Sequence, residues 1–112
     1  MDKVRWVVVL SPKFLNRPFL CTVVPISTTP PHTVEKYHVK LDTDPAPNPS
    51  GAPAWVKCDM VMTVGFERLS AHWDGKVNGR RNYVTLRVSD KELEAIRWAV
   101  IHALGLGGLC KP

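Results

Sequence analysis

Two apolar runs near the start of the chain constrain its fold more than any other feature. They span Trp6 to Leu10, WVVVL, and Leu20 to Ile26, LCTVVPI. Both runs are short and rich in β-branched residues, which is typical of strands, and the first lacks alternation, which predicts burial on both of its faces. The joining segment, Ser11 to Pro18, has a proline near each end, and proline cannot donate a hydrogen bond to a sheet. The sequence therefore predicts a strand, a turn and a second strand.

The second run contains Pro25 and ends in three hydroxyl residues. A proline within a strand predicts an edge position or a bulge, which would re-aim the residues that follow. Those residues are Ser27, Thr28 and Thr29. Hydroxyls at a strand end commonly bond to nearby backbone, so both a turn-forming role and a catalytic role stay open for them.

Apolar and polar residues alternate in several later segments. The further strands that we predict are Tyr37 to Leu41, Trp55 to Met62, Val64 to Leu69 and Tyr83 to Val88. In the second of these segments, a period of two places Lys57 and Asp59 on one face, with alpha carbons about 6.5 Å apart. Such a pair is either a solvated ion pair of small energetic value or a chemically useful pair of opposite charges.

The last part of the chain predicts one helix. Ser89 and Glu92 have the spacing of a capping box, apolar residues then recur at helical spacing to about Leu104, and Gly105 can end the helix in a left-handed conformation. The proline-rich segment at about 42–54 predicts a flexible surface loop, and the tail from about 106 is expected to fray. The predicted fold is α+β, mainly β: a small, partly open antiparallel barrel with a C-terminal helix, in a single domain over residues 1–112.

Charge and composition limit the class of partner. Fifteen Lys and Arg against ten Asp and Glu give a net charge of +5 and a pI near 9.4, which suits RNA, DNA or an acidic protein. The three cysteines have neither disulfide-framework nor zinc-site spacing, so no metal or cofactor is predicted. No apolar run approaches the roughly 20 residues that span a bilayer, and the start is too short for a signal peptide. We therefore expect a soluble, cytoplasmic protein.

The most basic segment lies between two turn signals. Asp74-Gly75 and Asn78-Gly79 enclose Lys76, and Arg80 and Arg81 follow. Such a cluster is either a solvated loop or a surface that contacts phosphates.

Several short motifs, taken in order, resemble the PemK/MazF-type toxins of toxin–antitoxin modules. The motifs are RWVVVLSP, Asn16-Arg17, CTVVPISTT, WVKCDMV with Thr63 beyond it, and the capped helix. Together they cover nearly the whole chain. The resemblance implies an SH3-like barrel, a homodimer, a cognate antitoxin, and metal-independent cleavage of single-stranded mRNA by attack of the 2′-hydroxyl.

The resemblance also implies roles for individual residues. Asp59 matches a position assigned to proton transfer, which makes it the expected base, and Lys57 is the expected acid or charge-stabilising group. Arg5 and Ser27 are expected to contact phosphate oxygens. The candidate RNA contacts beyond these four are Arg17, Thr28, Thr29, Arg80 and Arg81.

Two departures from the family pattern bear on activity. Members usually begin with another strand and a long loop, and in the PemK branch this loop brings a histidine to the site. Here only four residues precede Arg5, so we expect that strand and loop to be missing. We also expect no other histidine to replace the one that the loop supplies. Lys57 stands where that branch has arginine, so the charge is kept but the planar fork is lost. Two alternatives stay open: a non-catalytic relative that binds antitoxin or a target such as gyrase, as CcdB-like proteins do, and a plain SH3-like nucleic-acid-binding module.

Overall fold

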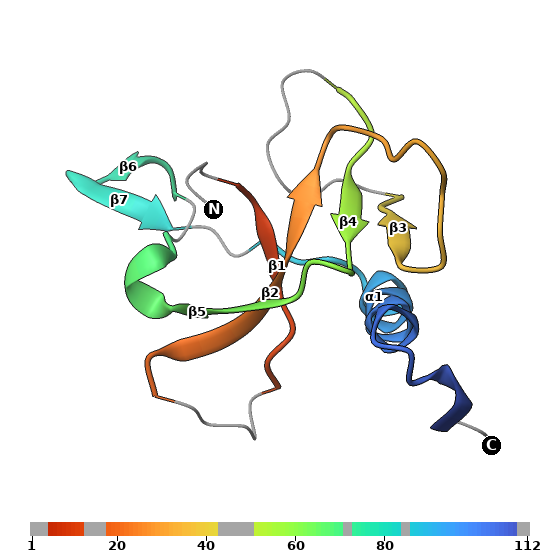
Figure 1. The fold of residues 1–112 in the computed structure, drawn as a ribbon. Coiled ribbons are helices and arrows are strands. Elements are labelled where there is room, and N and C mark those ends of the chain that lie inside the picture. The colour runs from red at the N-terminus through yellow and green to blue at the C-terminus, as the bar shows by residue number, and fades with distance from the viewer. Residues whose placement is uncertain (1–4, 13–17, 43–50, 71–72, 84–85, 110–112) are drawn as a thin grey trace.

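The computed structural model describes residues 5–12, 18–42, 51–70, 73–83 and 86–109 (Figure 1). Its elements are β1 (Val7–Val9), β2 (Leu20–Ser27), β3 (His38–Lys40), β4 (Trp55–Lys57), β5 (Met62–Gly65), β6 (Trp73–Val77), β7 (Arg80–Tyr83) and α1 (Asp90–Ala103), with short 3₁₀ helices at Phe66–Arg68 and Gly107–Leu109. The predicted mainly β fold with a C-terminal helix is confirmed. No helix among the described residues is long and apolar enough to cross a membrane.

The main sheet is built around β2. This strand pairs antiparallel with β1 along one side; along the other it pairs first with β5 and then with β4, and β3 pairs with β4 beyond. Because β2 changes partner along its length, the sheet bends, and β5 runs away from β4 and β3 (Figure 1). Among the described strands the sheet stays open and does not close into a barrel.

Pro25 lies where β2 changes partner, and our prediction of an edge or a bulge there is wrong. The backbone groups of Thr22 and Ile26 bond toward β1, so the nitrogen of Pro25 faces the opposite side of the strand. On that side β5 pairs as far as Val23 and β4 pairs from Ile26. The missing donor therefore falls in the gap between two neighbours, which is how a central strand can hold a fully buried proline.

The hydrophobic core lies between this bent sheet and α1. Its buried members are Val8, Val24, Leu41, Ala54, Val56, Cys58, Ile96 and Ala99. Two adjacent valines of β2, Val23 and Val24, are both fully buried, so β2 is covered on both faces. Burial on both faces was predicted for β1 instead, and that prediction is wrong because Val9 is 52% exposed. β1 therefore covers the core with one face only.

The helix begins and ends as its sequence predicts. The Glu92 backbone N–H donates to Ser89 Oγ at 3.1 Å and the Ser89 N–H donates to Glu92 Oε1 at 2.9 Å, which completes the capping box. Glu92 is buried, and its Oε2 also accepts the Asp42 N–H at 2.9 Å. The cap thus joins the helix start to the chain that leaves β3. Gly105 has φ of 72°, the left-handed conformation expected after the helix.

Several predicted boundaries are wrong. The single strand predicted over 55–62 is two strands, β4 and β5, with a turn between them. β5 ends at Gly65 and a 3₁₀ helix follows, so most of the strand predicted over 64–69 does not form. The last predicted strand lies too late, because β7 covers the basic segment and 86–88 are not strand. A 3₁₀ helix at Gly107–Leu109 lies within the tail for which fraying was predicted, and positions 43–50 of the predicted loop lie outside the described residues.

Candidate active site

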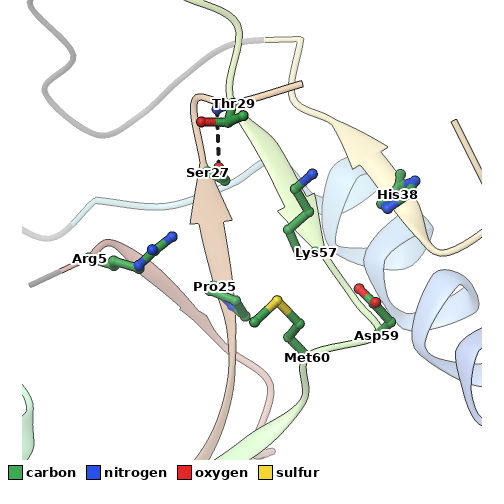
Figure 2. Close-up of a pocket in the computed structure, with 8 residues that line it drawn as sticks. All are labelled: Arg5, Pro25, Ser27, Thr29, His38, Lys57, Asp59 and Met60. Atoms are coloured by element: carbon green, nitrogen blue, oxygen red, sulfur yellow. Dashed lines mark hydrogen bonds between the residues drawn. The ribbon is translucent and has the colours of Figure 1, made fainter. Parts of the chain in front are cut away.

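A pocket of about 410 Å³ opens beside the C-terminal ends of β2 and β4. Figure 2 shows the residues that line it: Arg5, Pro25, Ser27, Thr29, His38, Lys57, Asp59 and Met60. These residues come from segments that are far apart in the sequence. All four residues predicted to be catalytic are among them.

Ser27 is the last residue of β2 and pairs with Trp55 of β4. Its Oγ accepts a hydrogen bond from the Thr29 N–H at 3.1 Å, which turns the chain directly after the strand (Figure 2). The hydroxyl proton is not used by this bond, so Ser27 can still donate to a bound group. The turn-forming role and a role in the pocket are therefore compatible. Thr29 also lines the pocket, whereas Thr28 is exposed outside it.

Lys57 and Asp59 are brought together by a turn, so the predicted same-face strand pair is wrong in its geometry. β4 ends at Lys57, whose carbonyl accepts the Met60 N–H at 3.1 Å and closes a four-residue turn. The Cys58 N–H donates to the Tyr37 carbonyl at 3.0 Å and ties this turn to the chain before β3. Lys57 is half-buried in the pocket wall, and Asp59 is exposed at its edge (Figure 2).

Cys58 lies within the turn but packs into the core and does not line the pocket. Its side chain is fully buried in the core. Burial, and to a smaller extent the Asp59 carboxylate, raises the pKa of the Cys58 thiol from 9.0 to about 12. A neutral thiol is a poor nucleophile, so the chemistry of the pocket falls to the groups around it.

Arg5 is held at the pocket by the residue that follows it. The Ile26 N–H donates to the Trp6 carbonyl at 2.9 Å, which extends the pairing of β1 with β2 toward Arg5. Arg5 is exposed and its guanidinium reaches the pocket from the β1 side (Figure 2). In the structure, the bond between Ile26 and Trp6 therefore places the neighbouring Arg5 beside the pocket.

His38, which the sequence did not single out as a site residue, also lines the pocket. It lies on β3 directly opposite Lys57 of β4. Its Nδ1 accepts the Glu35 N–H at 2.9 Å, and the Tyr37 ring packs edge-on against it at a centroid distance of 4.6 Å. With Nδ1 engaged, Nε2 is the ring atom left to bind a ligand. The alternation of the predicted strand does place His38 on the outer face, but which strand would lie beside it could not be read from the sequence.

The remaining predicted RNA contacts do not belong to this pocket. Arg80 and Arg81 lie on β7, in a separate two-stranded sheet with β6. Arg17 lies outside the described residues. Within the described part of the chain, no cluster of His, Cys, Asp or Glu could hold a metal ion.

Sequence comparison now decides the family. The sequence model of the family described as PemK-like, MazF-like toxin of type II toxin-antitoxin system matches residues 1–104. The chain belongs to this family. The pocket described above is therefore the candidate active site of a PemK/MazF-family toxin. A comparison with curated proteins gives no match.

Solved structures of similar fold agree with this assignment. The Mycobacterium tuberculosis toxin MazF-mt6 is 24% identical with a TM-score of 0.65, and the alignment covers 95% of this chain and 91% of that one. An endoribonuclease from a mycobacterial species is 21% identical with a TM-score of 0.65 over 95% of this chain and 85% of that one. A third structure, of a mycobacterial endoribonuclease in complex with its cognate antitoxin, is 19% identical with a TM-score of 0.63 over 94% and 84% of the two chains. At these identities the likeness shows that the chain has the MazF-like fold.

Proposed function

We propose that this PemK/MazF-family toxin is an endoribonuclease that cleaves single-stranded RNA by attack of the 2′-hydroxyl on the adjacent phosphate. The observation that carries the proposal is the meeting of Arg5, Ser27, Lys57 and Asp59 in one pocket. Together they supply two cations, a hydroxyl and a carboxylate, which are the group types that this reaction uses. Two of the solved structures of similar fold are named as endoribonucleases, which supports the same reaction class.

Asp59 and Lys57 have complementary roles in the proposed step. The Asp59 carboxylate takes the proton of the 2′-hydroxyl as the 2′-oxygen forms its bond to phosphorus. The bond between phosphorus and the 5′-oxygen breaks, and the Lys57 ammonium gives that oxygen its proton. The products are a 2′,3′-cyclic phosphate and a 5′-hydroxyl end. The two groups lie within one four-residue turn, which fixes their relative position.

Arg5, Ser27 and His38 surround the place where the phosphate would lie. Arg5 approaches from the β1 side and His38 stands on the β3 side, with Ser27 at the end of β2 between them (Figure 2). The arginine and the hydroxyl can donate to non-bridging phosphate oxygens, and His38 can donate from Nε2. These donors would stabilise the charge that builds on the phosphate oxygens during attack. Thr28 and Thr29 extend this polar rim and are the proposed contacts to the neighbouring nucleotide.

The cleavage proposal is tested with one RNA and its chemically matched partner. The substrate is a long unstructured RNA, and the partner carries a single 2′-deoxy sugar at the mapped cleavage position. We expect wild type to cut the first and spare that position in the second, because the attacking group is gone. Asp59→Asn should lower the cleavage rate at least about a hundredfold. Glu94→Gln, the same change on an exposed face of α1, is the matched control and should cut like wild type.

The opposite results identify the alternatives. The endoribonuclease proposal is wrong if the wild-type protein leaves RNA intact and expression of the Asp59→Asn variant still stops growth. A non-catalytic toxin that acts on a protein target is then the remaining interpretation. If it binds RNA and DNA equally and cuts neither, it is a nucleic-acid-binding module.

The proposed partners are a cognate antitoxin and a second copy of the chain. One structural relative was solved with its antitoxin, and the net charge of +5 fits an acidic segment that occupies the same groove as RNA. We expect the antitoxin to abolish cleavage in a one-to-one titration against toxin sites. Light scattering on the isolated toxin should give the mass of a homodimer. A monomer that is fully active would contradict the proposed assembly.

A further inference from the structure

The side chain of Met60 lies in the pocket, whereas the apolar side chains on either side of it in the sequence pack into the core. Cys58 is a buried member of the core cluster, and Val61 packs against that cluster. Met60 belongs to neither group; it is 48% exposed and lines the pocket. The turn holds its backbone in place, because the Met60 N–H donates to the Lys57 carbonyl at 3.1 Å. Packing in the core therefore does not account for the position of this side chain.

Met60 and Pro25 form the apolar part of the pocket. Figure 2 shows the Met60 side chain extending toward Pro25. Arg5 lies on one side of this pair and Asp59 on the other (Figure 2). Pro25 is fully buried, so Met60 supplies most of the exposed surface of the pair, and the other residues that line the pocket are polar or charged. Single exposed apolar side chains are common, but one that lies among charged groups in a pocket suits a ligand with an apolar part and a charged part.

The position of Met60 next to Asp59 indicates which nucleotide it meets. In the proposed reaction, the Asp59 carboxylate takes the proton of the attacking 2′-hydroxyl. That hydroxyl belongs to the nucleotide on the 5′ side of the cleaved bond, so the ribose of this nucleotide lies against Asp59. The base projects from the same ribose, and the next side chain of the turn that lines the pocket is Met60. The base on the 5′ side of the cleaved bond is therefore the one within its reach.

We propose that Met60 packs against the face of the base whose nucleotide carries the attacking 2′-hydroxyl. Unstacked bases of single-stranded RNA bind to proteins by such contacts, and a thioether is a favourable neighbour for an aromatic ring. The contact holds the ribose with its 2′-hydroxyl at Asp59, so Met60 binds the substrate and takes no part in proton transfer. Because the face of the base is touched and not its edge, the contact requires a base without selecting one by its hydrogen bonds. The inference rests on the proposed function, which defines the nucleotide.

The charges around Met60 favour a nucleotide over an apolar side chain from an acidic protein segment. One nucleotide supplies a base for Met60, a 2′-hydroxyl for Asp59 and, on its 3′ side, a phosphate for the two cations Arg5 and Lys57. An acidic segment that placed an apolar side chain on Met60 would bring carboxylates close to Asp59, and like charges at short distance repel each other. The mixture of groups in the pocket therefore fits RNA better.

Removal of single bases from the RNA tests the contact. The substrates are a short RNA that wild type cuts at one mapped bond, the same RNA with a base-free ribose on the 5′ side of that bond, and a third with the base-free ribose on the 3′ side. On intact RNA, Met60→Ala should lower kcat/KM by roughly three- to tenfold. Met60→Leu keeps an apolar side chain of similar size and should stay within about twofold of wild type.

The base-free substrates show which base is contacted. On RNA without the 5′ base, wild type and Met60→Ala should have nearly equal kcat/KM, because the partner of Met60 is already absent. On RNA without the 3′ base, the full difference between the two proteins should remain. Met62→Ala is the matched control, because Met62 lies on β5 and does not line the pocket, and it should cut all three RNAs like wild type.

The outcomes separate this inference from the proposed function. If wild type cuts the intact RNA and Met60→Ala cuts it equally well, or has the same defect with and without the 5′ base, the inference alone fails. If Met60→Ala cuts like wild type but needs more of the cognate antitoxin for inhibition, a protein segment is the occupant and the inference is wrong. Wild type that leaves the intact RNA uncut overturns both proposals. Melting temperatures close to that of wild type would show that the Met60 variants fold, as expected for a residue outside the core cluster.

Discussion

At the scale of single residues, substitutions of Lys57 distinguish two roles for its ammonium group, proton donation and charge stabilisation. If its ammonium gives a proton to the 5′-oxygen, Lys57→Met should slow cleavage by about 10²–10⁴-fold. Lys57→Arg should also be slow, at least about tenfold, although it keeps the charge, because a guanidinium holds its proton much more tightly. Single-turnover cleavage of a defined RNA would give both rates.

A substrate with sulfur in place of the bridging 5′-oxygen is the control for this prediction. A thiolate leaves without needing a proton, so on this substrate Lys57→Met should cut at nearly the wild-type rate. A defect of the same size on both substrates would contradict the acid role and would leave charge stabilisation as the contribution of Lys57.

Cys58 gives a prediction about stability that does not depend on the reaction. In the unfolded chain the pKa of this thiol has its usual value of 9.0, whereas burial in the folded state raises the pKa to about 12. Above 9.0 the unfolded state therefore gains free energy by ionising, and the free energy of unfolding falls as the pH rises toward 12. Cys58→Ala should be about 1 kcal/mol less stable at neutral pH but should lack this component of the decline. Urea titrations of both proteins across this range measure the difference, and parallel curves would contradict it.

The sequence predicted those site residues that belong to local motifs, and it missed a residue that sheet pairing brings to the site. Ser27 and Asp59 were found because each belongs to a short local motif that the family resemblance could match. His38 was missed because it reaches the site through the pairing of β3 with β4, and its position opposite Lys57 is a matter of sheet register. A half-buried strand with a histidine on its outer face is a weak signal until its neighbour is known.

At the scale of elements, the start of α1 depends on the Ser89–Glu92 box. Ser89→Ala should lower the free energy of unfolding by about 1 kcal/mol. Glu92→Ala should cost more, about 2–3 kcal/mol, because it leaves the N–H groups of both Ser89 and Asp42 without their acceptor. Denaturant unfolding followed by circular dichroism measures both values. Glu94→Ala, an exposed glutamate on the same helix, is the matched control, and equal losses at 92 and 94 would contradict the prediction.

The elements were easier to predict than their ends. The helix carries its own start and stop signals in adjacent residues, so Asp90–Ala103 follows from the sequence alone. The turn after Lys57 contains neither glycine nor proline, and its alternating residues imitate a continuing strand. The prediction made from Pro25 was wrong for a related reason. A central strand can hold this proline because two different strands, β5 and β4, meet beside β2, and no local sequence pattern contains that property of the sheet.

At the scale of the whole molecule, the chain divides its tasks among separate regions. The core between the sheet and α1 supplies stability, and the pocket is lined by Pro25 and by residues at or just beyond the ends of β1, β2, β3 and β4. Residues 75–83 of the β6–β7 hairpin are exposed, and none of these described residues belongs to the core cluster or lines the pocket. Substitutions at these exposed positions should therefore have little effect on folding.

Removal of the hairpin tests this division directly. Trp73 pairs with Tyr83, so an Asn-Gly turn can join these two positions in place of residues 74–82. Because residues 75–82 of the removed segment are exposed and outside the core cluster, we expect the melting temperature to change by no more than about 4 °C, which corresponds to roughly 1 kcal/mol for a chain of this size. The shortened protein should cut short RNA at the wild-type rate, because no described side chain of the removed segment lines the pocket. Loss of the cooperative melting transition would show that the hairpin belongs to the folding unit, and slow cleavage of short RNA by a folded variant would show that it acts on the pocket.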